Sequence, residues 1–166
     1  MDFTIKLSVT ILIFLFAWLF QEENQSWDLQ RTVLKNAANV AAHDASLQID
    51  DDAKSRGFIV FDELAARSVF RDSLQRNLHL DASLAPISGS PVLSDVRVLL
   101  FDLLDDSNST FPLFYEDHSL GFSQWIFGPA VVVVVEIDHP RFIHSSFSHS
   151  PVRVPVVAEY KENMVF

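Results

Sequence analysis

The chain has 166 residues, with 12 Lys and Arg against 22 Asp and Glu, so its formal net charge is -10. This length accommodates one hydrophobic core, which argues against a multidomain enzyme with separate cofactor and substrate domains. The absence of cysteine excludes disulfides, thiolate zinc sites, iron–sulfur clusters and a cysteine nucleophile, and the acidic balance without a Lys/Arg cluster argues against nucleic acid as a partner.

The N-terminal segment contains an uncharged apolar run from Leu7 to Phe20. A membrane span needs about 20 apolar residues, and Phe3 and Ile5 extend the run while Lys6 can direct its ammonium to the headgroups. The run ends in bulky residues, whereas a cleaved signal peptide ends in small ones. We therefore predict an uncleaved membrane anchor over residues 1–25, with a cleaved signal or a buried soluble helix as alternatives. The anchor residues are Leu7, Ile11, Phe14, Trp18 and Phe20.

The predicted orientation places the N-terminus in the cytoplasm. Lys6 lies closer to the apolar run than Arg31 and Lys35 do on its other side, and positive residues next to a span favour the cytoplasmic side. Residues 26–166 then form a domain outside the cytoplasm, held in the cell membrane by a single pass.

Residues 26–49 contain no Gly or Pro and predict an amphipathic helix that continues from the anchor or is hinged to it. Leu29, Val33 and Val40 lie on its apolar face, which is otherwise rich in alanine. Small side chains let another backbone approach closely, so this face is a candidate contact for a partner protein. The alternative is that it packs on the domain's own sheet. The candidate contact residues are Ala37, Ala38, Ala41, Ala42 and Ala45.

The next segment predicts a polar turn over 50–57 and then a short apolar run over 58–61, which fits a strand or a packed extended segment. A second helix is predicted over 62–78, with Asp62 as its N-cap. Residues 79–91 contain two prolines and a glycine and predict a loop.

The second half of the chain changes to strand patterns. Five consecutive valines after Pro129 predict a strand that is buried on both faces, and Pro155 indicates an edge strand. The element order predicts an α+β fold, in which an N-terminal transmembrane helix, a long amphipathic helix and a second helix pack on a small antiparallel sheet. Strands are predicted at 91–106 (with a helical alternative for its Leu-rich middle), 110–115, 129–138 and 151–161, and 119–127 is ambiguous.

The histidines and acidic clusters lack the spacing of a metal site. His139, His144 and His149 recur every five residues, which suits neither one helix face nor one strand face. The acidic groups at 50–52 and 102–106 lack the spacing of a calcium loop and are typical of solvated turns. We predict no metal site and no cofactor.

Glu136 and Asp138 are the best candidate pair for acid–base catalysis, because a spacing of two places both on one face of a strand. Charged residues also mark the end of a strand where it reaches water. No nucleophile motif accompanies the pair, so we predict no catalytic site.

An apolar N-terminal helix that leads into an alanine-rich amphipathic helix (DLQRTVLKNAANVAAHDASLQI, residues 28–49) and then into antiparallel strands resembles the pilin-like proteins of bacterial surface appendages, especially TadE-like minor pseudopilins. In that family the apolar helix anchors the subunit, and the outer domain helps to build or prime a pilus or secretion fibre. The chain lacks the glycine that precedes the apolar run of a prepilin and the glutamate within it. This difference favours a permanently anchored component over a processed fibre subunit.

Together these patterns predict a non-enzymatic, membrane-anchored component of a bacterial cell-envelope assembly. Its expected partners are the lipid bilayer and other assembly proteins, or further copies of the chain itself. The alternative is an anchored extracytoplasmic sensor or ligand-binding domain, with a pocket lined by the aromatic residues around Trp125. A third hypothesis is a membrane-bound hydrolase that uses Glu136, Asp138 or a histidine.

Overall fold

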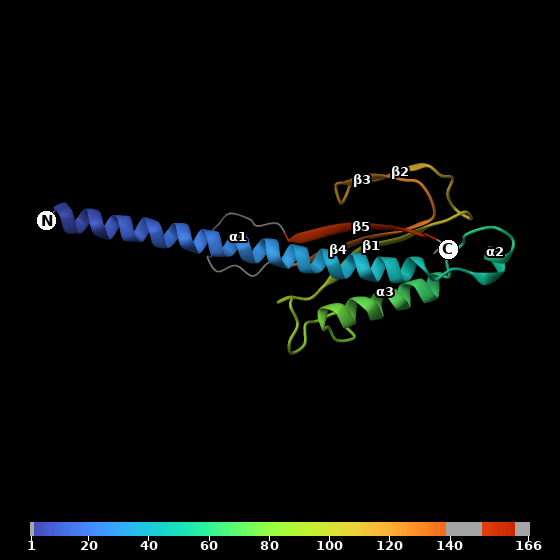
Figure 1. The fold of residues 1–166 in the computed structure, drawn as a ribbon, viewed down its shortest axis with the longest axis horizontal. Coiled ribbons are helices and arrows are strands. Elements are labelled where there is room, and N and C mark those ends of the chain that lie inside the picture. Colours follow the sequence, from blue (N-terminus) through green and yellow to red (C-terminus); the bar gives the residue numbers. More distant parts are fainter. Residues whose placement is uncertain (1, 139–150, 162–166) are drawn as a thin grey trace, which may run out of the picture.

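The computed structural model describes residues 2–138 and 151–161 of the chain. It confirms the α+β class, with a long apolar N-terminal helix and small antiparallel sheets of three and two strands (Figure 1). The elements in chain order are α1 (Asp2–Ser46), α2 (Asp51–Ser55), α3 (Glu63–Leu78), β1 (Arg97–Leu104), β2 (Leu113–Asp117), β3 (Phe122–Ile126), β4 (Ala130–Ile137) and β5 (Val152–Glu159).

Helix α1 runs without interruption from the apolar segment into the domain. The chain has no Gly or Pro before Gly57, so nothing breaks the backbone ladder of the helix. With a rise of about 1.5 Å per residue, its 45 residues extend about 68 Å. The N-terminal part projects away from the domain, and the C-terminal part forms the domain's spine (Figure 1). The two predicted helical segments are therefore one continuous helix.

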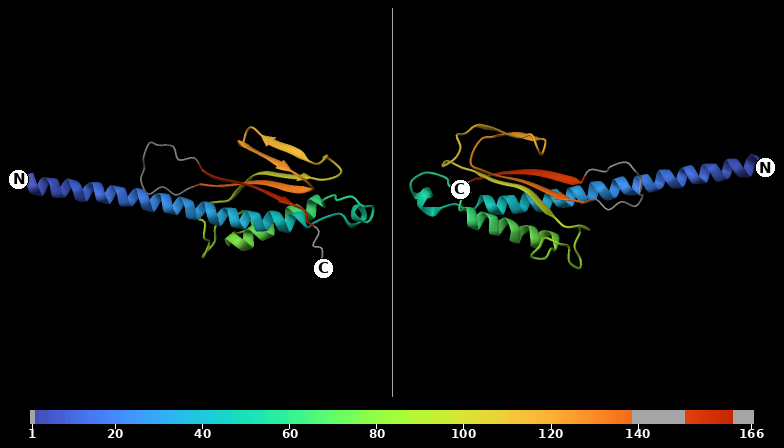
Figure 2. Two further views of the ribbon diagram at one scale, coloured as in Figure 1. Left: turned by 45° about the horizontal axis from the view of Figure 1, so that its top comes forward. Right: turned by 180° about the vertical axis from the view of Figure 1, so that it is seen from behind.

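The domain has three layers. The C-terminal half of α1 and the antiparallel helix α3 cover one face of a three-stranded sheet with the order β1-β4-β5. The hairpin formed by β2 and β3 covers the other face (Figures 1 and 2). All pairings in both sheets are antiparallel.

The central strand β4 is buried along its whole length, as the valine run predicted. Val131, Val133 and Val135 face the helices, while Ala130 and Val132 face the hairpin, because successive strand residues point to opposite faces. β1 and β5 occupy the two edges of β4, so the edge position predicted for residues 151–161 is confirmed.

Two other strand predictions need correction. The predicted strand 91–106 is a strand only over Arg97–Leu104. The predicted strand 110–115 lies instead at Leu113–Asp117, because Pro112 has no N–H to donate to a ladder. This strand pairs with Phe122–Ile126, so most of the segment 119–127, which the sequence left ambiguous, is also a strand.

The segment 58–61 is packed and extended rather than a strand, with a single bridge between Phe61 and Ile49. Its backbone is held by side chains at the end of β1. The Phe61 N–H donates to Asp105 at 3.0 Å, and the Ile59 N–H donates to Asp106 at 2.7 Å. Asp105 is buried, and its hydrogen bond to the Phe61 N–H links the segment 58–61 to the end of β1.

The alanine face of α1 is internal, which corrects the partner contact predicted for it. Ala38, Ala41, Ala42 and Ala45 are fully buried and Ala37 is 6% exposed. They lie in the main core, where α1 packs on α3, β4 and β5. The small side chains allow α3 and the sheet to approach the α1 backbone closely, so the domain itself occupies the face.

The apolar face of α1 is also rotated from its predicted position. Leu29 and Val40, which were assigned to it, are exposed, and Leu34 is fully buried. The alanines and Leu34 together set the contact with α3 and the sheet.

We predict that Ala41→Phe destabilises the domain, because a ring at this fully buried position has no space beside α3 and the sheet. Overpacking of this kind costs about 1–3 kcal/mol or more. The measurement is chemical unfolding of the full chain in detergent micelles, followed by circular dichroism. Val40→Phe is the matched control, since Val40 is the preceding residue and is 47% exposed. Equal stability of the two variants would contradict an internal alanine face.

Candidate functional site

The apolar N-terminal part of α1 is exposed along its whole length. All large apolar side chains from Phe3 to Phe20 are at least 43% exposed, including the five predicted anchor residues. So long an apolar surface is unstable in water. The helix has the length and composition of a membrane span, and a signal sequence near the N-terminus meets the same criteria. The predicted anchor residues are Leu7, Ile11, Phe14, Trp18 and Phe20.

Two polar side chains inside this segment donate hydrogen bonds to the helix itself. The Ser8 hydroxyl donates to the carbonyl of Thr4, and the Thr10 hydroxyl donates to the carbonyl of Lys6, both at 2.9 Å. A hydrocarbon environment offers no other partners to such groups. These two hydroxyls are therefore compatible with lipid contact.

The candidate acid pair, Glu136 and Asp138, belongs to an ion-pair cluster across the sheet. Register places Glu136 of β4 between Arg97 of β1 and Arg153 of β5. Arg97 Nη2 lies 2.7 Å from Glu136 Oε1 and 2.7 Å from an oxygen of Asp138, and Arg153 donates to the other oxygen of Glu136. Glu136 is buried, whereas the arginines are about half exposed. The cluster joins all three strands at one end of the sheet.

The acidic clusters in the turns have structural roles. Asp50 caps α2 by accepting from the Ala53 N–H at 2.9 Å, and Asp102 accepts the Tyr115 hydroxyl at 2.6 Å. No group of three or more His, Asp or Glu among residues 2–138 and 151–161 is arranged to hold a metal ion. The candidate histidines His139, His144 and His149 lie outside the described residues.

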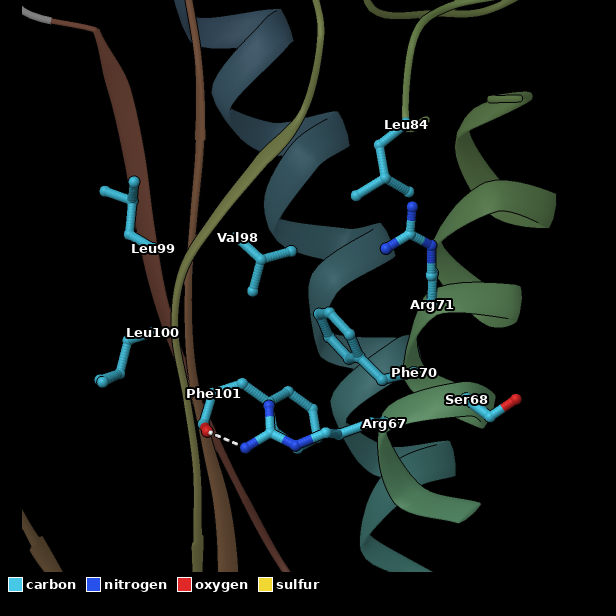
Figure 3. A pocket seen from close by; sticks show the side chains of 9 residues that line it. All are labelled: Arg67, Ser68, Phe70, Arg71, Leu84, Val98, Leu99, Leu100 and Phe101. Atoms are coloured by element: carbon cyan, nitrogen blue, oxygen red, sulfur yellow. Dashed lines mark hydrogen bonds between the residues drawn. The ribbon is translucent and has the colours of Figure 1, made fainter. Parts of the chain in front are cut away.

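A groove of about 540 Å³ lies between α3 and the free edge of β1, and we call it the α3–β1 groove (Figure 3). Its floor is apolar, and the rings of Phe70 and Phe101 pack edge to face there at 5.2 Å between centroids. Val98 and Leu99 remain 38% and 37% exposed. The lining residues are Arg67, Ser68, Phe70, Arg71, Leu84, Val98, Leu99, Leu100 and Phe101.

Two arginines, one helical turn apart on α3, line the groove. Arg67 extends across it to β1, whereas Arg71 extends along the helix toward Leu84 (Figure 3). Arg67 pairs with Glu63 at 2.9 Å, covers the Phe101 ring at 4.7 Å, and donates to the Phe101 carbonyl at 3.4 Å. Arg71 donates to the carbonyl of Ala82. It makes no ion pair with any carboxylate of residues 2–138 or 151–161.

A second groove, of about 560 Å³, lies along the other edge of the sheet between α1, β5 and the β2–β3 hairpin. Trp125 and Phe127 line it and are 54% and 71% exposed. Asn39 and His43 of α1 form its opposite side. The aromatic residues around Trp125 thus lie beside a surface groove, as the ligand-binding alternative requires.

The sequence patterns did not indicate the α3–β1 groove. They predicted the helix over 62–78, but the facing strand comes about thirty residues later in the chain and forms the edge of the sheet only in the folded domain. The available signal was the spacing of Arg67 and Arg71 by four, which places both on one side of the helix.

No protein-family model, curated protein or solved structure matches the chain.

We predict that Glu136→Ala lowers the free energy of unfolding by about 1–3 kcal/mol, because it leaves Arg97 and Arg153 side by side without their shared carboxylate. The exposure of both arginines keeps the loss below that of a fully buried pair. Asp138→Ala is the matched control and should cost about 1 kcal/mol or less, since Asp138 is 63% exposed. Chemical unfolding of both variants measures the difference, and equal losses would contradict the role assigned to Glu136.

A second prediction concerns alkaline pH. Burial raises the pKa of Tyr115, and the hydrogen bond to Asp102 and the charges of Asp102 and Asp117 add to the rise. A pKa raised by folding means that this stabilisation is complete below about pH 10, the ordinary tyrosine value, and is lost as the pH rises further. Tyr115→Phe lacks this loss, so the stability gap between wild type and variant should narrow from about pH 8 to about pH 11. A constant gap would contradict the prediction.

Proposed function

We propose that the chain is a membrane-anchored, non-enzymatic component of a bacterial cell-envelope assembly of the pilus or secretion type, acting through protein–protein contacts. The observation that carries the proposal is α1, a single unbroken helix whose N-terminal part is exposed and apolar while its C-terminal part is the spine of the domain. The bilayer is the first partner, and the domain lies outside the cytoplasm.

The dimensions of α1 support this role. Residues 3–20 rise about 27 Å as a helix, close to the hydrocarbon thickness of a bilayer, about 30 Å. Beyond them the helix continues without a break into the core, where α3 and the sheet hold it along its alanine face. An anchor joined in this way fixes the height and direction of the domain above the membrane, which suits a scaffold better than a freely moving receptor.

The layout of the domain also supports the pilin-like resemblance. A long N-terminal helix, half projecting and half packed on an antiparallel sheet, is the arrangement that the resemblance implies. The missing prepilin glycine and glutamate favour a subunit that stays anchored. Among the described residues, the engagement of Glu136 and Asp138 by arginines supports a role without catalysis.

The alternative is an anchored extracytoplasmic sensor or ligand-binding domain. The groove beside Trp125 favours it, since exposed aromatic side chains there lie next to polar groups of α1 and β5. Such a site binds small amphipathic molecules through ring stacking and a few hydrogen bonds. A rise in melting temperature with a candidate ligand, lost in Trp125→Ala, supports this alternative.

We predict that the full chain with a C-terminal epitope sediments with membranes, and that protease digests the epitope in intact spheroplasts. The expectation follows from the exposed apolar helix and from Lys6 on its cytoplasmic side. Ile11→Arg is the matched test, because a charge at the centre of the span costs about 2.5–3.5 kcal/mol of insertion free energy. It should move the protein toward the soluble fraction.

A cytosolic marker protein controls for leakage. An epitope that is protected until lysis would invert the topology, and it would replace an envelope assembly with a cytoplasmic, membrane-tethered adaptor. A protein shortened at its N-terminus and released from the membrane would show that the apolar helix is a cleaved signal sequence.

A further inference from the structure

We propose that the α3–β1 groove binds an extended acidic–apolar peptide segment of a partner protein, with a carboxylate of that segment opposite Arg71. The inference rests on the proposed function, because it names the chemistry of one partner of the anchored domain. It combines a free strand edge, an apolar floor and an arginine without an ion-pair partner in the described chain.

The free edge of β1 supplies the backbone part of the site. Among residues 2–138 and 151–161, β1 pairs with β4 along one side only. Its Phe101 carbonyl is directed away from β4 toward α3, where Arg67 donates to it at 3.4 Å. This distance is longer than that of a well-formed N–H···O hydrogen bond. An incoming peptide N–H therefore replaces a weak bond, and an extended segment is the natural occupant of an open strand edge.

The edge is irregular at one point. The register shifts between Val98 and Leu100, so Leu99 is an extra residue in the strand. A bulge prevents a long flat edge from pairing indiscriminately with other strands. Next to the bulge, Val98 points toward α3 and is partly exposed at the groove (Figure 3), where an apolar side chain of a short bound segment can pack on it.

Charge selects the partner. The chain as a whole has a net charge of -10, yet two arginines face this groove (Figure 3). Arg67 is neutralised by Glu63. Asp81 precedes the Ala82 carbonyl that accepts from Arg71, and its Oδ1 accepts from Ser83 and Ala85. No carboxylate of the described residues pairs with Arg71, so its positive charge beside apolar surface matches a carboxylate on an otherwise apolar segment.

The fixed position of Arg71 adds to this selectivity. Its guanidinium donates to the Ala82 carbonyl and lies beside Leu84 in Figure 3. A side chain that is already held in place loses less conformational freedom when it binds a carboxylate. The remaining N–H groups of the guanidinium are available for that bond.

The test uses the full chain, purified in detergent micelles, and two fluorescent peptides, one of alternating valine and glutamate and one of alternating valine and lysine. Fluorescence anisotropy should show saturable binding of the glutamate peptide only. Arg71→Glu should weaken this binding about tenfold or more. Arg76→Glu is the matched control, because Arg76 is an exposed arginine of the same helix outside the groove. It makes the same change in net charge and should leave the affinity unchanged.

A second variant, Val98→Glu, places a like charge on the opposite wall, since Val98 points from β1 toward α3 (Figure 3) and is 38% exposed. It should weaken binding of the glutamate peptide without unfolding the domain. The proposal fails if the glutamate peptide does not bind, if both peptides bind alike, or if Arg71→Glu and Arg76→Glu weaken binding equally. A further outcome is that neither peptide binds, that the protein associates with itself, and that Arg71→Glu abolishes this self-association. That result would assign the groove to a second copy of the chain and would also overturn the proposal. Because purified protein is used, these outcomes are independent of the topology assay that tests the proposed function.

Discussion

The close contact between the alanine face of α1 and the rest of the domain is the constraint on which the other features depend. Five small side chains bring α3 and the sheet against one helix backbone, and the same helix carries the exposed apolar segment. Larger side chains there would push both neighbours away and loosen the link between anchor and domain. The alanines therefore serve the internal architecture, and partner contacts must involve other surfaces.

The sheet is built around β4, which is covered on both faces and paired on both edges. A strand so enclosed tolerates no charge except at its end, and there Glu136 is bracketed by arginines from the two neighbouring strands. The cluster fixes the register of all three strands, because a shift of one residue would separate the charges and turn every valine to the opposite face. What looked from spacing like a possible acid–base pair is an ion-pair cluster that holds the sheet together.

The two edges of the sheet have different surroundings. The β5 edge lies beside exposed aromatic residues and polar groups of α1. The β1 edge lies beside arginines from α3 and carries a bulge. A domain with two chemically distinct grooves on opposite edges of its sheet can contact two different neighbours at once. This arrangement fits the proposed assembly component, which would act by presenting binding surfaces to other proteins.

The sequence by itself determined the local features of this protein. The apolar run, the absence of Gly and Pro through α1, the Asp62 cap of α3 and the valine run of β4 each depend on interactions between residues close in the chain, and each was predicted. Only the tertiary structure decided what the alanine face contacts, which partners hold Glu136, and that Arg67 and Arg71 line a groove beside β1. These outcomes depend on contacts between segments tens of residues apart. Periodicity shows that a helix has an apolar side, but only the assembled layers decide which element covers it.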